Sequence, residues 1–86
     1  MLRCKLVVRC VEVVKDSDGN VETERVFMEA VHGEDGTPNG EWSKFTPAAN
    51  FSITITNPRA FGRLPEGAEV MADLTLCAGL AEGAQP

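Results

Sequence analysis

Apolar and polar residues alternate with a period of two through the C-terminal half of this sequence. One apolar series consists of Phe51, Ile53 and Ile55, and a second consists of Ala68, Val70, Ala72, Leu74 and Leu76. Because successive side chains of a strand point to opposite faces of a sheet, each series predicts a strand with one buried face. The residues between them predict a short helical turn after Asn57 and a tight turn at Pro65-Glu66-Gly67.

The first strand shows the same alternation, but its phase changes in the middle. Its apolar positions are first even-numbered and then odd-numbered: Leu2, Cys4, Leu6, Val8 and Cys10, followed by Val11 and Val13. A β-bulge near residues 10–12 would restore the apolar face and bend the strand, as small barrels require. The strand is expected to end at the hairpin turn Asp16-Ser17-Asp18-Gly19-Asn20, because Gly and Asn tolerate a positive φ.

The return strand is predicted to span residues 21–31. The apolar residues of one face are Val26, Met28 and Ala30, and those of the other are Phe27 and Val31. Both faces are therefore expected to be partly covered, either by a partner subunit or by the curl of a barrel. The charged residues are expected to keep this strand soluble, and these are Glu22, Glu24, Arg25 and Glu29.

Residues 33–50 carry several turn-forming residues and predict a long irregular loop or arm. This segment contains Trp42, the single tryptophan, followed by Lys44 and Phe45. Two interpretations are open at this point. The aromatic side chains either fold back to cap the small core, or they lie on an arm that docks on a partner, since Trp is favoured at the centres of interfaces. The candidate partner interface comprises Trp42, Phe45, Phe27 and Lys44.

The composition argues against an enzyme, a metalloprotein and a membrane-spanning protein. The 86-residue chain has one His, no Tyr and no glycine-rich phosphate loop, so it lacks the groups that converge in catalytic sites. Its three cysteines have no CxxC spacing, and the calcium-loop mimic that starts at Asp16 has Val21 and Phe27 where Gly and Glu are required. No apolar run reaches the length of a membrane helix. We therefore expect no catalytic residue, no cofactor and no metal.

The charge of the chain argues against nucleic acid as a partner class. The net charge is −5, whereas affinity for phosphate backbones comes mainly from Lys and Arg. Arg3, Lys5 and Arg9 nevertheless alternate along the first strand, and aromatic residues are available for base stacking. The alternative function is therefore a small OB-like barrel that binds single-stranded nucleic acid.

Three segments together resemble a set of small uncharacterised proteins encoded by tailed bacteriophages and prophages. These are Trp42-Ser43-Lys44-Phe45-Thr46-Pro47, Ser52-Ile53-Thr54-Ile55-Thr56-Asn57-Pro58 and Pro65-Glu66-Gly67-Ala68-Glu69-Val70. The resemblance extends from Trp42 to Leu76 and departs at Met71, where an aromatic residue is more usual. It implies a phage origin and a place in the virion as a small capsid-associated or decoration-type protein, present in the host cytoplasm before assembly.

We predict an all-β fold, a small antiparallel barrel or sandwich of about four to five strands with one short helical turn. Residues 1–78 are expected to form a single domain, and residues 79–86 a loose tail. The expected function is that of a non-enzymatic virion structural protein of the capsid decoration or cement type. Its expected partners are the major capsid protein and further copies of the chain itself, in a homo-oligomer, with no membrane contact.

Overall fold

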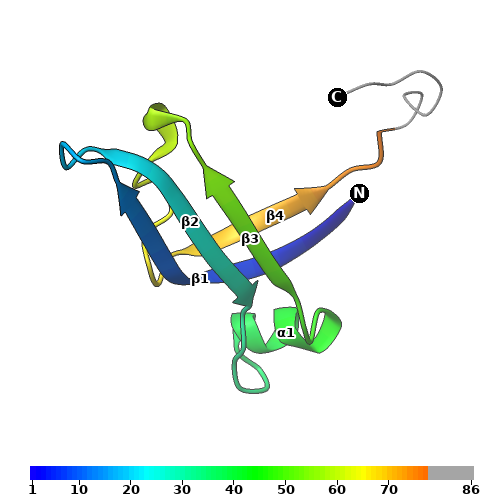
Figure 1. Cartoon of the computed structure of the whole chain (residues 1–86). Helices are drawn as coiled ribbons and strands as arrows, with labels where there is room; N and C mark the ends of the chain where they lie inside the picture. Colours follow the sequence, from blue (N-terminus) through cyan, green and yellow to red (C-terminus); the bar gives the residue numbers. More distant parts are fainter. Residues whose placement is uncertain (78–86) are drawn as a thin grey trace.

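A computed structural model describes residues 1–77, and these form four strands and one short α-helix. The elements are β1 (Leu2–Lys15), β2 (Val21–Ala30), α1 (Pro38–Phe45), β3 (Asn50–Ile55), the 3₁₀ helix η1 (Pro58–Ala60) and β4 (Glu69–Leu74). The strands pair antiparallel in the order β3-β2-β1-β4 (Figure 1). The prediction of an antiparallel β protein is confirmed. The described residues form one open sheet and not a closed barrel, because β3 and β4 are its two edges.

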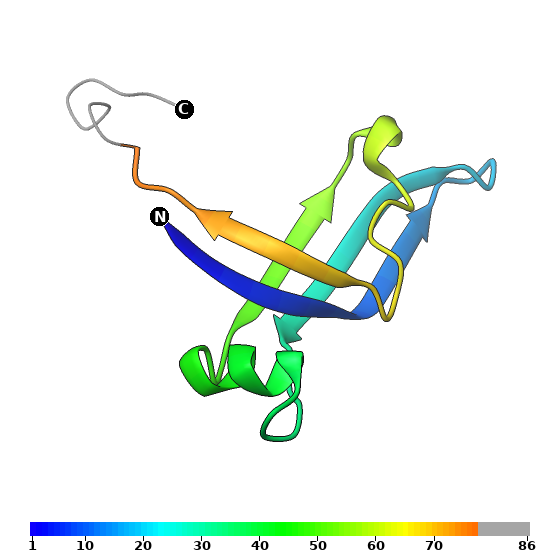
Figure 2. The ribbon, with the colours of Figure 1, turned by 180° about the vertical axis from the view of Figure 1, so that it is seen from behind.

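β1 is long enough to pair with two neighbours along different parts of its length. Residues 2–7 pair with β4, and residues 6–15 pair with β2. The register to β2 shifts between Val8 and Cys10, which leaves Arg9 as the extra residue of a β-bulge. The predicted bulge is thus present, just before the residues where the sequence placed it. Figures 1 and 2 show β1 curving from its pairing with β4 into its pairing with β2.

The bulge changes which side chains β1 presents to each face of the sheet. On its N-terminal side Leu6 and Val8 are buried, whereas beyond it Val11 packs against the same core and Cys10 is exposed. We call the face that carries the buried side chains the inner face, and the opposite one the outer face. The sequence analysis placed Cys10 on the same face as Leu6 and Val8, and this prediction is wrong. The extra residue at Arg9 reverses the alternation, so Cys10 does not lie on the inner face.

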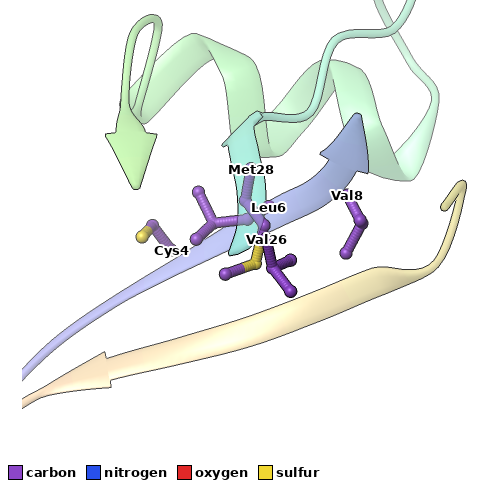
Figure 3. Packing of buried hydrophobic residues seen from close by; sticks show 5 residues of the cluster. All are labelled: Cys4, Leu6, Val8, Val26 and Met28. Atoms are coloured by element: carbon purple, nitrogen blue, oxygen red, sulfur yellow. The ribbon is translucent and has the colours of Figure 1, made fainter. Parts of the chain in front are cut away.

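The core lies on the inner face, beside the part of β1 that runs between β2 and β4 (Figure 3). Its buried residues are Cys4, Leu6, Val8, Val26 and Met28. Partly buried side chains of β3, β4 and their connection surround it, among them Ile53, Leu64 and Val70. Burying one Val, Leu or Met side chain contributes about 1.5–3 kcal/mol, so a core of this size provides limited stability. Leu2 and Leu74, which continue the same face, are exposed.

The turns that the sequence predicted are present. In the hairpin, Asp16 Oδ1 accepts hydrogen bonds from the N–H groups of Asp18 and Asn20, at 2.9 and 3.0 Å. Gly19 follows with a φ of 85°, in the region that glycine favours. At the short helical turn after β3, the Asn57 side chain accepts a hydrogen bond from the N–H of Arg59 at 3.0 Å and caps η1.

Residues 33–50 are not the irregular loop that the sequence predicted, because they contain α1. Thr37 caps the helix by accepting a hydrogen bond from the N–H of Gly40 at 3.0 Å, and Pro38 stands in the first turn. Gly40 is needed there, since a Cβ atom at this position would collide with the carbonyl group of Glu34. Pro38 and Gly40 are also common turn residues, and for this reason the sequence pattern predicted a loop.

β4 is shorter than predicted. It ends at Leu74, opposite Leu2, where β1 has no further residue to pair with it. Leu76 beyond it is 90% exposed. Residue 78, the last of the predicted domain, and the predicted tail, residues 79–86, lie outside the described residues.

Glu24 is a buried carboxylate, whereas the sequence placed it among the residues that keep β2 soluble. It lies on the inner face with an exposed fraction of 4%. Its carboxylate accepts a hydrogen bond from the backbone N–H of Gly62, with distances of 3.0 and 3.3 Å to the two oxygens. Gly62 belongs to the connection from β3 to β4, and Leu64 of this connection packs against the core. Glu24 therefore anchors the connection as it crosses the inner face between the two edges of the sheet.

We expect Glu24→Ala to lower the free energy of unfolding by about 1.5–3 kcal/mol, the range for a hydrogen bond to a charged group. Glu24→Gln keeps an acceptor for the Gly62 N–H and removes the buried charge, so its effect is expected to stay below about 1 kcal/mol. Urea unfolding of both variants measures the difference. Equal losses for the two variants would show that the carboxylate has a role beyond this hydrogen bond.

Candidate protein-binding site

The structure brings together two of the four residues that the sequence assigned to an interface. Trp42 and Phe45 line a shallow pocket of about 240 Å³ together with Arg3, Glu41 and Thr46. We call these five residues the helix patch. The patch joins side chains of α1 to the outer face of β1, two segments that are far apart in the sequence.

The other two predicted interface residues lie outside the helix patch. Lys44 is an exposed residue of α1, and its Nζ lies 3.9 Å from Oε1 of Glu41. Phe27 is half-buried on the outer face of β2, where it lines a separate pocket of about 290 Å³ with Arg9 and Ser52. Phe27 is therefore not part of the same surface as Phe45.

The aromatic residues of α1 do not cap the core. Phe45 is 80% exposed and Trp42 is half-buried, and neither packs against the buried cluster of the inner face. The reason is that α1 lies on the outer face, beside Arg3 and Lys5, whereas this buried cluster lies on the inner face. Of the two interpretations left open by the sequence, the one in which these side chains close the core is therefore not what the fold shows.

A closed group of hydrogen bonds holds the first turn of α1 against the sheet. Lys5 Nζ donates to Asn39 Oδ1 at 2.8 Å, and Asn39 Nδ2 donates to Glu69 Oε2 at 2.7 Å. Lys5 Nζ also lies 3.2 Å from Glu69 Oε1. We call these three residues the polar junction. The hydrogen bond from Asn39, followed by that from Lys5, holds the pKa of Glu69 below its ordinary value.

Arg3 is held in place within the helix patch by a second acid of β4. Its Nε donates to Asp73 Oδ1 at 2.6 Å, and its Nη2 donates to Asp73 Oδ2 at 3.2 Å. This two-point contact lowers the pKa of the Asp73 carboxyl, chiefly through the hydrogen bond from the Arg3 guanidinium. The guanidinium therefore has a fixed orientation at the edge of the pocket that Trp42 and Phe45 line.

The basic residues that alternate along β1 are all paired with acids. Arg3 pairs with Asp73, Lys5 with Glu69, and Arg9 Nε lies 2.6 Å from Glu29 Oε1. The outer face thus carries no run of free cations along this strand, which removes the main support for phosphate binding.

The described residues contain no group of three or more His, Cys, Asp or Glu side chains placed to hold a metal ion. Cys4 is buried, and Cys10 and Cys77 are exposed thiols. No helix in the described part of the chain is both long and apolar enough to span a membrane.

The sequence analysis named Arg3 and Lys5 only as part of a basic row, and it missed their places in the helix patch and the polar junction because these depend on strand register. Lys5 and Glu69 come together since residues 2–7 of β1 pair with β4, a pairing that no local pattern encodes. A signal for α1 was available in Thr37-Pro38 followed by Glu41, an N-terminal helix pattern.

No protein-family model, curated protein or solved structure matches the chain.

The polar junction gives the stability of the protein a pH dependence that Glu69→Gln is expected to remove. Because the pKa of Glu69 is lowered on folding, its ionised form stabilises the protein above its ordinary pKa of 4.5. This contribution is lost as the pH falls through the lower, folded-state pKa. The difference in melting temperature between wild type and Glu69→Gln is therefore expected to be present at pH 7 and to vanish in acid.

The matched control for this measurement is Glu66→Gln. Glu66 is an exposed turn residue, so this substitution makes the same change in net charge away from the polar junction. Its melting temperature is expected to follow that of the wild type at each pH. A Glu69→Gln protein that behaves like Glu66→Gln would show that the polar junction does not stabilise the fold.

Proposed function

We propose that this protein is a non-enzymatic assembly module that binds another protein through the helix patch. The observation that supports this most directly is the 80% exposure of Phe45 beside half-buried Trp42. An aromatic pair exposed on a small domain is typical of an interaction site, and Trp and Arg are enriched among the residues that dominate binding energy.

The way α1 is attached to the sheet supports the same proposal. The polar junction fixes the first turn of the helix, and Asp73 orients Arg3. A surface that is ordered before binding loses less conformational entropy when the partner arrives. The helix patch therefore combines an apolar centre with an ordered cation at its rim, the arrangement that protein interfaces favour.

We further propose that the partner is the major capsid protein of a phage, and that the protein is a decoration or cement component of the virion. The support is the resemblance of residues 42–76 to small phage and prophage proteins. On this proposal the protein is in the host cytoplasm before assembly and on the particle afterwards. The small barrel that the sequence predicted is also part of this proposal. β1 is curved, and a further strand at an edge of the sheet would bring the sheet closer to closure.

Single-stranded nucleic acid is the weaker alternative. It needs exposed cations interleaved with aromatic side chains. The cations of β1 are engaged by Asp73, Glu69 and Glu29, and Phe27 is separated from Trp42 and Phe45. An enzymatic function has no clustered reactive groups to support it among the described residues.

The first test of this proposal is Phe45→Ala. Because the side chain is exposed, its loss is expected to change the free energy of unfolding by less than about 0.5 kcal/mol. Binding to capsids assembled without the protein is expected to weaken by about 2 kcal/mol or more, roughly thirtyfold. Co-sedimentation with capsids over a range of protein concentrations measures the affinity.

Leu76→Ala is the matched control, since Leu76 is a similarly exposed apolar residue outside the helix patch. It is expected to bind capsids like the wild type. Quantitative mass spectrometry of purified particles provides the independent test, with copies in a fixed ratio to the major capsid protein as the expected result. Absence of the protein from the particles would refute the virion assignment, and full capsid binding by Phe45→Ala would refute the role of the helix patch.

A further inference from the structure

β3 presents a row of unpaired backbone groups at one edge of the sheet. The N–H of Ala30 donates to the carbonyl oxygen of Ala49 at 3.0 Å, which sets the hydrogen-bonding phase of the β2–β3 pair. In an antiparallel pair every second residue turns its N–H and C=O to the same neighbour. Phe51, Ile53 and Ile55 therefore bond to β2, and the backbone groups of the residues between them point away from the sheet.

The outward residues are Asn50, Ser52 and Thr54, and all three side chains are exposed. No other segment within residues 1–77 pairs with this edge. Natural edge strands are usually protected by a charge, a proline or a bulge. β3 has none of these between residues 50 and 55, and its pairing with β2 is continuous. It is an open template for one more strand.

The second edge of the sheet differs in charge. The even-numbered residues of β4 hydrogen-bond to β1. The outward backbone groups therefore belong to the residues between them, Glu69, Met71 and Asp73. Two copies joined through β4 in an antiparallel pair centred on Met71 would place Glu69 opposite Asp73, which is unfavourable in a chain of net charge −5. β3 carries no charge, so two copies meet there without repulsion between facing side chains.

We propose that β3 pairs antiparallel with β3 of a second copy of this chain, around a two-fold axis at Ser52. In this register Ser52 faces Ser52 of the second copy, and Asn50 faces Thr54. Every outward N–H and C=O of these residues then has a partner, because the facing residues form hydrogen-bonded pairs. The result is a continuous sheet across two copies, the closed two-fold arrangement that is most common among homo-oligomers.

The same register also joins the apolar rows of the inner face. Phe51, which is 39% exposed in one copy, faces Ile53 of the second copy. Aromatic and β-branched residues are a favourable cross-strand pair. This pairing covers apolar surface that the small core of a single copy leaves in water, so the second copy extends the core as well as the sheet.

This surface is separate from the helix patch and from the two faces of residues 21–31, whose apolar residues led the sequence analysis to expect cover by a partner subunit or by the curl of a barrel. β2 lies between β1 and β3, so neither of its edges is free. The edge that can accept a second copy is that of β3.

The test places like or opposite charges at the proposed two-fold axis. Ser52→Lys and Ser52→Glu are each expected to weaken self-association about fivefold or more, because identical charges then face each other. An equimolar mixture of the two variants is expected to recover self-association, since opposite charges face each other in the mixed dimer. Sedimentation velocity over a range of concentrations measures each sample, with the wild-type mass rising from that of one copy to that of two.

Met71→Lys and Met71→Glu are the matched controls. Met71 is a half-exposed residue at an outward position of β4, so these variants make the same charge changes at the other edge. They are expected to self-associate like the wild type. Ser52→Pro is a further variant that removes an outward N–H without removing a β2–β3 hydrogen bond, and it is expected to yield a folded monomer, as judged by circular dichroism.

A wild-type protein that remains a single copy at every concentration would overturn the proposal. So would Ser52→Lys and Ser52→Glu variants that each dimerise like the wild type, or a mixture that does not recover dimers. Phe45→Ala is expected to leave self-association unchanged. Loss of capsid binding in that variant therefore tests the helix patch, and loss of dimers in the Ser52 variants tests the β3 edge.

Discussion

A single extra residue in β1, Arg9, allows one strand to serve two neighbours on a curved sheet. Before the bulge the even-numbered side chains face the core, and after it the odd-numbered Val11 takes that position. Without the bulge, one half of β1 would turn its polar side chains into the core. β4 pairs with the residues of β1 that precede the bulge, and there Arg3 contacts Asp73 and Lys5 contacts Glu69.

The strands were predictable because alternation is a local property. The residues of β2 and β3 that the sequence assigned to a buried face, such as Val26 and Ile53, do lie on the inner face. Glu24 shows the limit of that argument. Its alternation with Val26 was visible in the sequence, but a charged residue is normally placed on the surface, and only the passage of Gly62 over β2 makes its burial favourable.

The helix was missed for a different reason. Pro38 and Gly40 favour turns in most contexts, and they fit a helix here because Pro38 stands in the first turn and Gly40 packs against the Glu34 carbonyl group. Trp42 and Phe45 were identified as candidate interface residues from their chemistry alone. Their position on the outer face was not predictable, since it depends on which face of β1 the polar junction occupies.

The distribution of charge assigns different tasks to the two edges of the sheet. On β4 the acids are used within the chain, where Glu69 and Asp73 hold α1 and Arg3 in place. A strand of a second copy at this edge would bring further carboxylates close to them. β3 has no charged residue to hold any element of its own chain, and its polar side chains are small and neutral. In a domain with so limited a core, an uncharged edge is a strong site for pairing with an identical edge, because backbone hydrogen bonds and apolar burial are gained together there.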